Sequence, residues 1–165
     1  MILVALGANL PRAAETPAQT IDAAIAALDR GATRVRARSR LYESPPWPQP
    51  SDQPWYVNAV VRLETALDPE ALLAHLHAIE REFGRVRGSR NAARTLDLDL
   101  LDYEGRVRDG DPTLPHPRLA TRAFVLLPLR DVAPEWRHPL DGRTLAALIA
   151  ALPTGEICRP LPPRA

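Results

Sequence analysis

The segment "RTLDLDLLDY", residues 94–103, has the pattern of a strand that is apolar on one face and acidic on the other. Asp97 and Asp99 alternate with leucines, and side chains two residues apart on a strand point to the same side of the sheet. Aspartate is disfavoured in strands, and two like charges on one face repel each other unless a cation lies between them. Either Arg94 or a divalent metal ion could supply that cation.

The rest of the chain is predicted to alternate strands and helices. Apolar periodicity, helix caps and glycine stops predict a short strand that ends at Gly7, a helix from the Thr16 cap to Gly31, strands at 33–42 and 56–65, a helix from the Asp68 cap to Phe83, a strand-like segment at 125–129 and a last helix at 145–152. With the acidic strand, the order β-α-β-β-α-β predicts an α+β, ferredoxin-like antiparallel sheet. We expect helices on one face and loops over the ligand face.

Length and composition indicate a single globular domain, residues 1–165, with a flexible tail at 159–165. The net charge is +1, so no overall field attracts nucleic acid or anionic membranes. A single cysteine, Cys158, excludes an internal disulfide and a cysteine zinc cluster. No run approaches a membrane span, and the apolar residues 2–6 are too few for a signal peptide, so we expect a cytoplasmic protein.

The basic residues are all arginine, 21 in number, and the chain contains no lysine. This excludes a Walker-type nucleotide site, which needs its lysine, and Schiff-base chemistry with pyridoxal phosphate. Any phosphate bound by this chain is therefore held by arginine, histidine, backbone amides or a metal ion.

The acid pair Asp97 and Asp99 permits two interpretations. Two carboxylates together with phosphate oxygens suit Mg²⁺, which prefers hard oxygen ligands and keeps some of its waters. Alternatively, nearby arginines neutralise the pair without any metal. Four arginines precede the acids, and such groups bind phosphate oxygens in two-point contacts, although a solvated basic loop has the same composition. They are Arg85, Arg87, Arg90 and Arg94.

Other polar residues could belong to the same site. His116 stands between two prolines in "LPHP" and precedes Arg122 by six residues, a combination suited to a nucleotide phosphate. His77 and Glu80 are spaced i, i+3 on the second helix, so they could face the site or form a surface contact. A structural role for the lone His116 is the alternative.

Tyr56 and Asn58 share one face of the strand at 56–65 by the same two-residue spacing. An aromatic ring beside an amide that both donates and accepts is suited to a flat heterocycle. An aromatic residue on a sheet face beside a satisfied asparagine explains the pattern equally well.

Taken together, the segments resemble the 6-hydroxymethyl-7,8-dihydropterin pyrophosphokinase family of folate biosynthesis. The resemblance covers nearly the whole chain and rests on "LGANL", "SRLYESPPW", "DQPWYVNAVVRLET", "GRVR", "ARTLDLDLL" and "LPHPRLATRAFVLLPL", in the family's order. It implies the ferredoxin-like fold, ATP as co-substrate, and transfer of pyrophosphate from MgATP to the hydroxymethyl oxygen of the pterin, with release of AMP.

The resemblance also implies roles for individual residues. Asp97 and Asp99 would bind two Mg²⁺ ions, and Arg85 and Arg94 would lie closest to the transferred group. The implied pterin-binding residues are Tyr56 and Phe124, which stack on the ring, Asn58, which reads its edge, and Ser44, Pro45 and Trp47. The implied ATP-binding residues are His77, Glu80, Arg85, Arg87, Arg94, Leu100, Thr113, His116 and Arg122.

The chain departs from the family at residues 90–99. Many members read "RWGPRTLDLD" where this chain reads "RNAARTLDLD", so Asn91 stands in place of a tryptophan and Ala93 in place of a proline. The chain therefore lacks the tryptophan that would cover the site on closure, and Trp47 or Trp55 is the alternative aromatic lid.

Parts of the sequence are also compatible with two other functions. A ferredoxin-like RNA-binding module would use the arginines at 34–40 as a phosphate track, but the near-neutral charge and the two acids argue against it. Another two-metal nucleotidyl or phosphoryl transferase would use the same acid pair. We expect a monomer whose partners are small molecules, with neither nucleic acid nor membrane among them.

Overall fold

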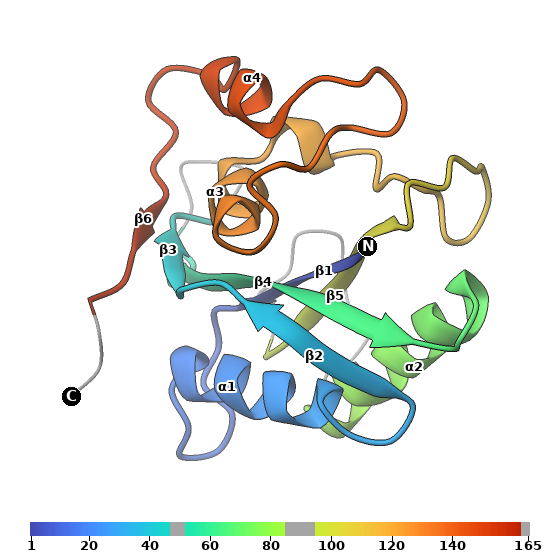
Figure 1. The fold of residues 1–165 in the computed structure, drawn as a ribbon. Helices are drawn as coiled ribbons and strands as arrows, with labels where there is room; N and C mark the ends of the chain where they lie inside the picture. The colour runs from blue at the N-terminus through green and yellow to red at the C-terminus, as the bar shows by residue number, and fades with distance from the viewer. Residues whose placement is uncertain (47–51, 85–94, 163–165) are drawn as a thin grey trace.

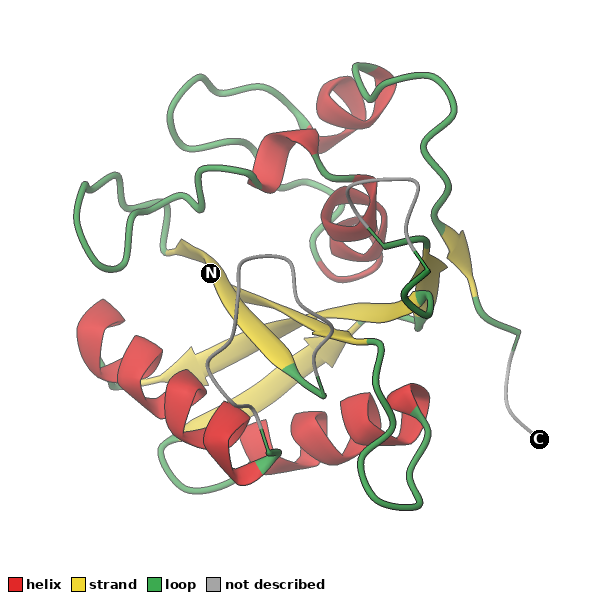
Figure 2. Ribbon diagram, turned by 180° about the vertical axis from the view of Figure 1, so that it is seen from behind, coloured by secondary structure: helices red, strands yellow, loops and turns green. Residues whose placement is uncertain are grey.

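The computed structural model describes residues 1–46, 52–84 and 95–162 (Figures 1 and 2). Its strands are β1 (Ile2–Ala8), β2 (Thr33–Arg38), β3 (Tyr42–Ser44), β4 (Tyr56–Thr65), β5 (Asp97–Tyr103) and β6 (Arg159–Pro160). Its helices are α1 (Pro17–Leu28), α2 (Pro69–Glu82), α3 (Ala123–Val132) and α4 (Leu145–Ala150), with a 3₁₀ turn at Leu119–Thr121.

The predicted antiparallel sheet is confirmed. The strands lie in the order β5-β1-β4-β3-β6, with β2 also paired to β4, and each pair is antiparallel. β1 lies between β4 and β5, and its side chains alternate between two buried layers: Val4 and Leu6 belong to one, Leu3 and Ala5 to the other. The apolar run of β1 therefore reflects burial on both faces.

Helices α1 and α2 cover one face of the sheet (Figure 1). Both begin as their sequences predict: Thr16 and Gln19 form a capping box, and the Asp68 side chain accepts from the backbone N–H of Ala71. The layer between helices and sheet holds the larger apolar core, which includes Val4, Leu6, Ile21, Leu28, Leu72, Leu76 and Leu98.

We expected loops and ligand on the opposite face, but α3 lies over part of it and α4 packs on α3 (Figure 2). Residues 125–129, predicted to be strand-like, lie inside α3. A short apolar run has no periodicity that separates a buried strand from a buried helix. The second core cluster between α3, α4 and the sheet includes Leu3, Val60, Leu101, Leu126, Leu129, Leu145 and Leu148.

The segment predicted as one strand at 33–42 forms two, β2 and β3, and both pair with β4. The arginines of β2 are exposed, as the alternation predicts. Arg36 pairs with Glu64 at 2.5 Å and Arg38 pairs with Asp22 at 2.7 Å. Two of the arginines in this row therefore already face carboxylates.

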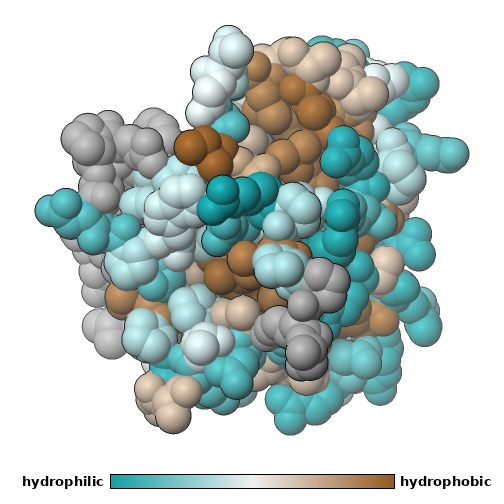
Figure 3. Space-filling view, turned by 90° about the vertical axis from the view of Figure 1, so that its left-hand side faces the viewer, coloured by the Kyte–Doolittle hydropathy of each residue, from teal (hydrophilic) through white to brown (hydrophobic). Residues whose placement is uncertain are grey.

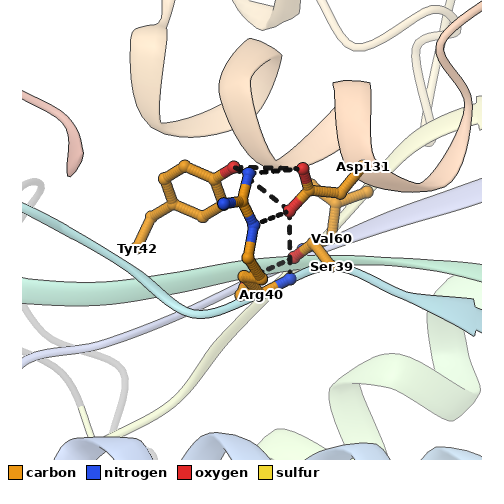
Figure 4. Close-up of polar contacts among 5 residues, drawn as sticks. All are labelled: Ser39, Arg40, Tyr42, Val60 and Asp131. Carbon is orange, nitrogen blue, oxygen red and sulfur yellow. Dashed lines mark hydrogen bonds and ion pairs between the residues drawn. The ribbon is translucent and has the colours of Figure 1, made fainter. Parts of the chain in front are cut away.

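A polar network joins α3 to the strand edge between β2 and β3 (Figure 4). Both Nε and the backbone N–H of Arg40 donate to one Asp131 oxygen at 3.1 Å, and the Tyr42 hydroxyl donates to the same carboxylate at 3.1 and 3.2 Å. Nearby, Ser39 Oγ accepts from the N–H of Val60 at 3.0 Å. The network anchors the start of β3, the strand that ends at the pocket described below.

Replacing Asp131 with asparagine is expected to lower the free energy of unfolding by about 1.5–3 kcal/mol near neutral pH, since charge-assisted hydrogen bonds are lost. Burial acts to raise the pKa of Asp131, but the bonds from Arg40 and Tyr42 outweigh it and hold the pKa below its ordinary value. A depressed carboxyl pKa stabilises the fold above the unfolded value and loses that effect as the pH falls through the folded value. The wild-type advantage should therefore shrink below about pH 4.

Urea titrations at several pH values would measure this difference. Asp22→Asn is the matched control, because Asp22 pairs with the half-exposed Arg38 at the surface, where ion pairs contribute little. The role given to the Asp131 carboxylate would be contradicted if the difference in unfolding free energy between wild type and Asp131→Asn stayed constant down to the pH of acid unfolding.

Candidate active site

Two adjoining pockets lie on the face of the sheet that bears the acid pair. The larger has a volume of about 670 Å³ and the smaller about 290 Å³. The same four residues line both of them: Asp97, Asp99, His116 and Pro117. A ligand in one pocket would therefore meet a ligand in the other beside two carboxylates and an imidazole.

The acid pair is positioned by β5. Asp97 and Asp99 are half-buried and pair in register with Gly7 and Ala5 of β1, while Leu98 between them is buried on the helix side. The predicted two-faced strand is confirmed. Within the described residues, no group of three or more histidine, cysteine or acidic side chains gathers as a metal site. A divalent ion here would thus need ligands beyond the two aspartates, such as phosphate oxygens and water.

Glu80 supports this strand from α2. It is 2% exposed, and its Oε1 accepts from the backbone N–H of Leu98 at 2.7 Å. Leu98 lies between the two acids, so a buried carboxylate holds the backbone that carries them. Glu80 does not line either pocket, whereas its neighbour His77 lines the smaller one.

The larger pocket brings together the residues that the sequence suggested for binding a flat heterocycle. Tyr56 and Asn58 of β4 line it, as does Ser44 of β3. Asn58 is 4% exposed, and its Nδ2 donates to Ser44 Oγ at 2.9 Å. The amide oxygen lies toward Gly7, where a Cβ would stand 3.5 Å from it. The bond to Ser44 therefore orients the Asn58 oxygen as an acceptor beside the pocket floor.

The start of α3 also lines the larger pocket. Phe124 lies in its first turn and Arg122 is its N-cap residue, and both line the pocket. The Arg122 guanidinium lies 5.3 Å from the centre of the Phe124 ring. A cation and an aromatic face are thus held together at this part of the pocket.

His116 is held by its own loop. Its backbone N–H donates to Leu101 of β5 at 2.8 Å, and its Nδ1 accepts from the N–H of Arg118 at 3.2 Å. Burial and, to a smaller extent, the cations Arg122 and Arg118 together lower the pKa of His116 to about 4, although Asp97 acts against them. The ring is therefore neutral near neutrality, with its proton on Nε2, where it can donate to an anionic oxygen.

The structure places most of the remaining site residues predicted from sequence around the two pockets. Leu100 and Thr113 line the smaller pocket, and Pro45 lines the larger. Four predicted residues, Trp47, Arg85, Arg87 and Arg94, lie outside the described residues, as does Arg90 of the basic loop.

Sequence reasoning did not identify several lining residues. Gly110, Asp111 and Pro112 form part of the smaller pocket, and their "GDP" turn signal immediately precedes Thr113. Thr121 and Glu156 line the larger pocket. Glu156 comes from a stretch in which no sequence pattern pointed to a site.

These features define a mixed α/β protein with an antiparallel sheet and a two-part pocket that meets at a pair of acids. The sequence model of the family described as 7,8-dihydro-6-hydroxymethylpterin-pyrophosphokinase (HPPK) matches residues 3–134. The chain belongs to this family.

Relatives and solved structures agree. A 2-amino-4-hydroxy-6-hydroxymethyldihydropteridine pyrophosphokinase of Pseudomonas aeruginosa is 48% identical over 155 residues, 92% of this chain and 91% of the relative. One of the same name from Haemophilus influenzae is 42% identical over 132 residues, 79% of each chain. The Plasmodium falciparum HPPK-DHPS wild-type structure superposes with a TM-score of 0.67 at 14% identity. The superposition covers 90% of this chain and 40% of the longer Plasmodium chain. At this low identity the similarity supports the fold alone.

Proposed function

We propose that this protein transfers pyrophosphate from ATP to the hydroxymethyl group of 6-hydroxymethyl-7,8-dihydropterin in folate biosynthesis. The hydroxyl oxygen attacks the β-phosphorus, the bond from that phosphorus to the α,β-bridging oxygen breaks, and AMP leaves while the hydroxyl proton is released. The observation that carries the proposal is the meeting of a heterocycle-sized pocket and a second pocket at Asp97 and Asp99.

The larger pocket is the pterin site. Tyr56 and Phe124, from β4 and α3, supply aromatic faces for the ring, and the Asn58 oxygen accepts from its N–H edge. Buried groups oriented in this way favour a ring that satisfies them and reject one that leaves them unpaired. Ser44 and Pro45 also line this pocket, and the family resemblance adds Trp47 to the proposed pterin-binding residues.

The smaller pocket is the ATP site. Leu73 and Leu100 give it a partly apolar wall, and His77 also lines it. The Nε2 proton of His116 offers a donor, whereas the Thr113 hydroxyl donates to the carbonyl of Gly110 at 2.7 Å and is left as an acceptor. Arg122 approaches from the larger pocket. The family resemblance adds Arg85, Arg87 and Arg94 as phosphate ligands. Since a primary hydroxyl is a simple nucleophile, the task of these residues is alignment and charge stabilisation.

Asp97 and Asp99 fit Mg²⁺, because two carboxylates on the shared wall leave room for phosphate oxygens and water as the other ligands. Bound there, Mg²⁺ would neutralise charge on the triphosphate. The chain itself positions the groups: β5 fixes the two carboxylates, and His116 donates a hydrogen bond without transferring its proton.

Further aspects of the proposal are the ferredoxin-like class of the sheet, a cytoplasmic location, a monomeric state and the absence of nucleic-acid partners. The order β5-β1-β4, followed by β2, supports the first of these. No helix in the described parts of the chain has both the length and the apolar character needed to cross a membrane.

Incubation with MgATP and 6-hydroxymethyl-7,8-dihydropterin tests the proposal, with nucleotide products separated by chromatography. AMP and the pterin pyrophosphate should form in equal amounts. The analogue with a methyl group in place of the hydroxymethyl group is the control, because it has no nucleophile and should give no AMP. Formation of ADP instead, or AMP without the pterin hydroxyl, would refute pyrophosphate transfer.

A further inference from the structure

The C-terminal segment, residues 156–161, lies beyond the family-matched residues 3–134, yet it reaches the larger pocket. Figure 1 shows β6 beside β3 at the edge of the molecule, and Figure 3 faces this side, where hydrophobic surface is interrupted by hydrophilic side chains. Two sets of contacts attach the segment, one to α3 and one to β3.

The first contact is at the start of α3. Arg122 is the N-cap residue of this helix, but its side chain makes no capping hydrogen bond. Instead, Glu156 Oε2 accepts from the backbone N–H of Ala123 at 3.1 Å, across 33 residues of sequence. The first N–H groups of a helix lack intrahelical partners, and a carboxylate is favoured beside them. Glu156 therefore supplies the acceptor that the local sequence does not.

The second set of contacts is on β3. Arg159 Nε donates to Glu43 Oε1 at 2.5 Å, and its guanidinium lies 5.4 Å from the centre of the Trp55 ring. The N–H of Leu161 donates to the carbonyl of Leu41 at 2.8 Å. These bonds fix the segment on the strand that ends at Ser44.

The two attachment points lie on two walls of one pocket. Ser44 lines the pocket from β3, and Phe124 lines it one residue after the N–H that Glu156 binds. Glu156 itself also lines the pocket. A residue that fixes the first turn of α3 thus fixes the position of the Phe124 ring relative to β4.

We propose that Glu156 is a positioning residue for the pterin site: it holds the first turn of α3, and with it Phe124, against the strap formed by residues 156–161. This inference rests on the proposed function, because it assigns the larger pocket to the pterin. It predicts an effect on pterin affinity that is separate from ATP affinity and from turnover.

The test compares Glu156→Ala, Glu156→Gln and the control Glu135→Ala, an exposed carboxylate just beyond the other end of α3. Loss of a helix-capping acceptor commonly changes an equilibrium by about 3–10-fold. We therefore expect Glu156→Ala to raise the pterin Kd and KM by about 3–10-fold while kcat and the KM for ATP stay within about two-fold. Glu156→Gln keeps an accepting oxygen and should restore the pterin Kd. Hydrogen exchange at the start of α3 should be faster in the alanine variant alone.

An unchanged pterin Kd in Glu156→Ala would overturn the inference, as would equal losses of pterin and ATP affinity, which indicate general destabilisation. Failure of the glutamine variant to restore binding would overturn the capping role. A wild-type protein that binds pterin without releasing AMP would instead refute the proposed function, and the binding and exchange measurements would still decide the role of Glu156.

Discussion

Asp97→Asn and Asp99→Asn are each expected to lower the turnover of pyrophosphate transfer by at least about 10³-fold while the fold stays intact. Asparagine keeps the shape of the side chain but removes the charge that would hold Mg²⁺ beside the triphosphate. The free energy of unfolding should stay the same or rise, because two like charges no longer share one strand face. Single-turnover AMP release and thermal unfolding of each variant measure the two effects.

Asp109→Asn is the matched control, since Asp109 is exposed and does not line either pocket. It should keep wild-type turnover. Metal binding gives a readout that does not depend on chemistry: Mn²⁺ bound together with a non-hydrolysable ATP analogue should be weakened in the two β5 variants only. Full activity in either variant would eliminate the proposed metal role of the acid pair.

The local sequence was sufficient where one pattern determines one structure. The alternation around Asp97 and Asp99 predicts a two-faced strand, and the cap at Thr16 predicts the start of a helix; both are confirmed. Their causes lie within a few residues of the chain, where side-chain period and backbone N–H groups leave little choice.

Distant contacts account for what the sequence could not predict. Asp102 lies on the same strand, β5, but faces the second core, where it accepts from Trp136 Nε1 at 2.6 Å and is 2% exposed. Strict alternation would place it on the leucine side, three residues after Asp99, but the pairing of β5 with β1 shifts register between Leu3 and Val4 and breaks that alternation. The layer made by α3 and the contribution of Glu156 depend in the same way on partners far along the chain.

Glu80 is the residue for which the structure and the family resemblance suggest different roles. The resemblance implies an ATP contact, but Glu80 Oε1 accepts from the N–H of Leu98 between the two acids. Its side chain is 2% exposed, and β5 is the last strand on its side of the sheet. A strand at an edge has backbone N–H groups that no further strand can satisfy. We propose that Glu80 acts through β5, by fixing the spacing of Asp97 and Asp99.

Glu80→Ala should then lower kcat by about 10–100-fold, as loss of a group that orients metal ligands commonly does, and raise the Mg²⁺ concentration needed for half-maximal activity. The buried N–H of Leu98 would lose its acceptor, which costs about 1–3 kcal/mol of unfolding free energy. Glu80→Gln retains an accepting oxygen and should recover most of the stability and most of kcat.

Metal titrations separate the two roles of Glu80. If Glu80 positions β5, Mn²⁺ binding measured by electron paramagnetic resonance in the presence of an ATP analogue weakens in Glu80→Ala, and metal-free affinity for the analogue stays within about two-fold of wild type. If Glu80 contacts ATP directly, Glu80→Ala loses affinity for the analogue to the same extent with and without metal, and Glu80→Gln does not restore that affinity. The second outcome would show that the hydrogen bond to Leu98 gives way when the nucleotide binds.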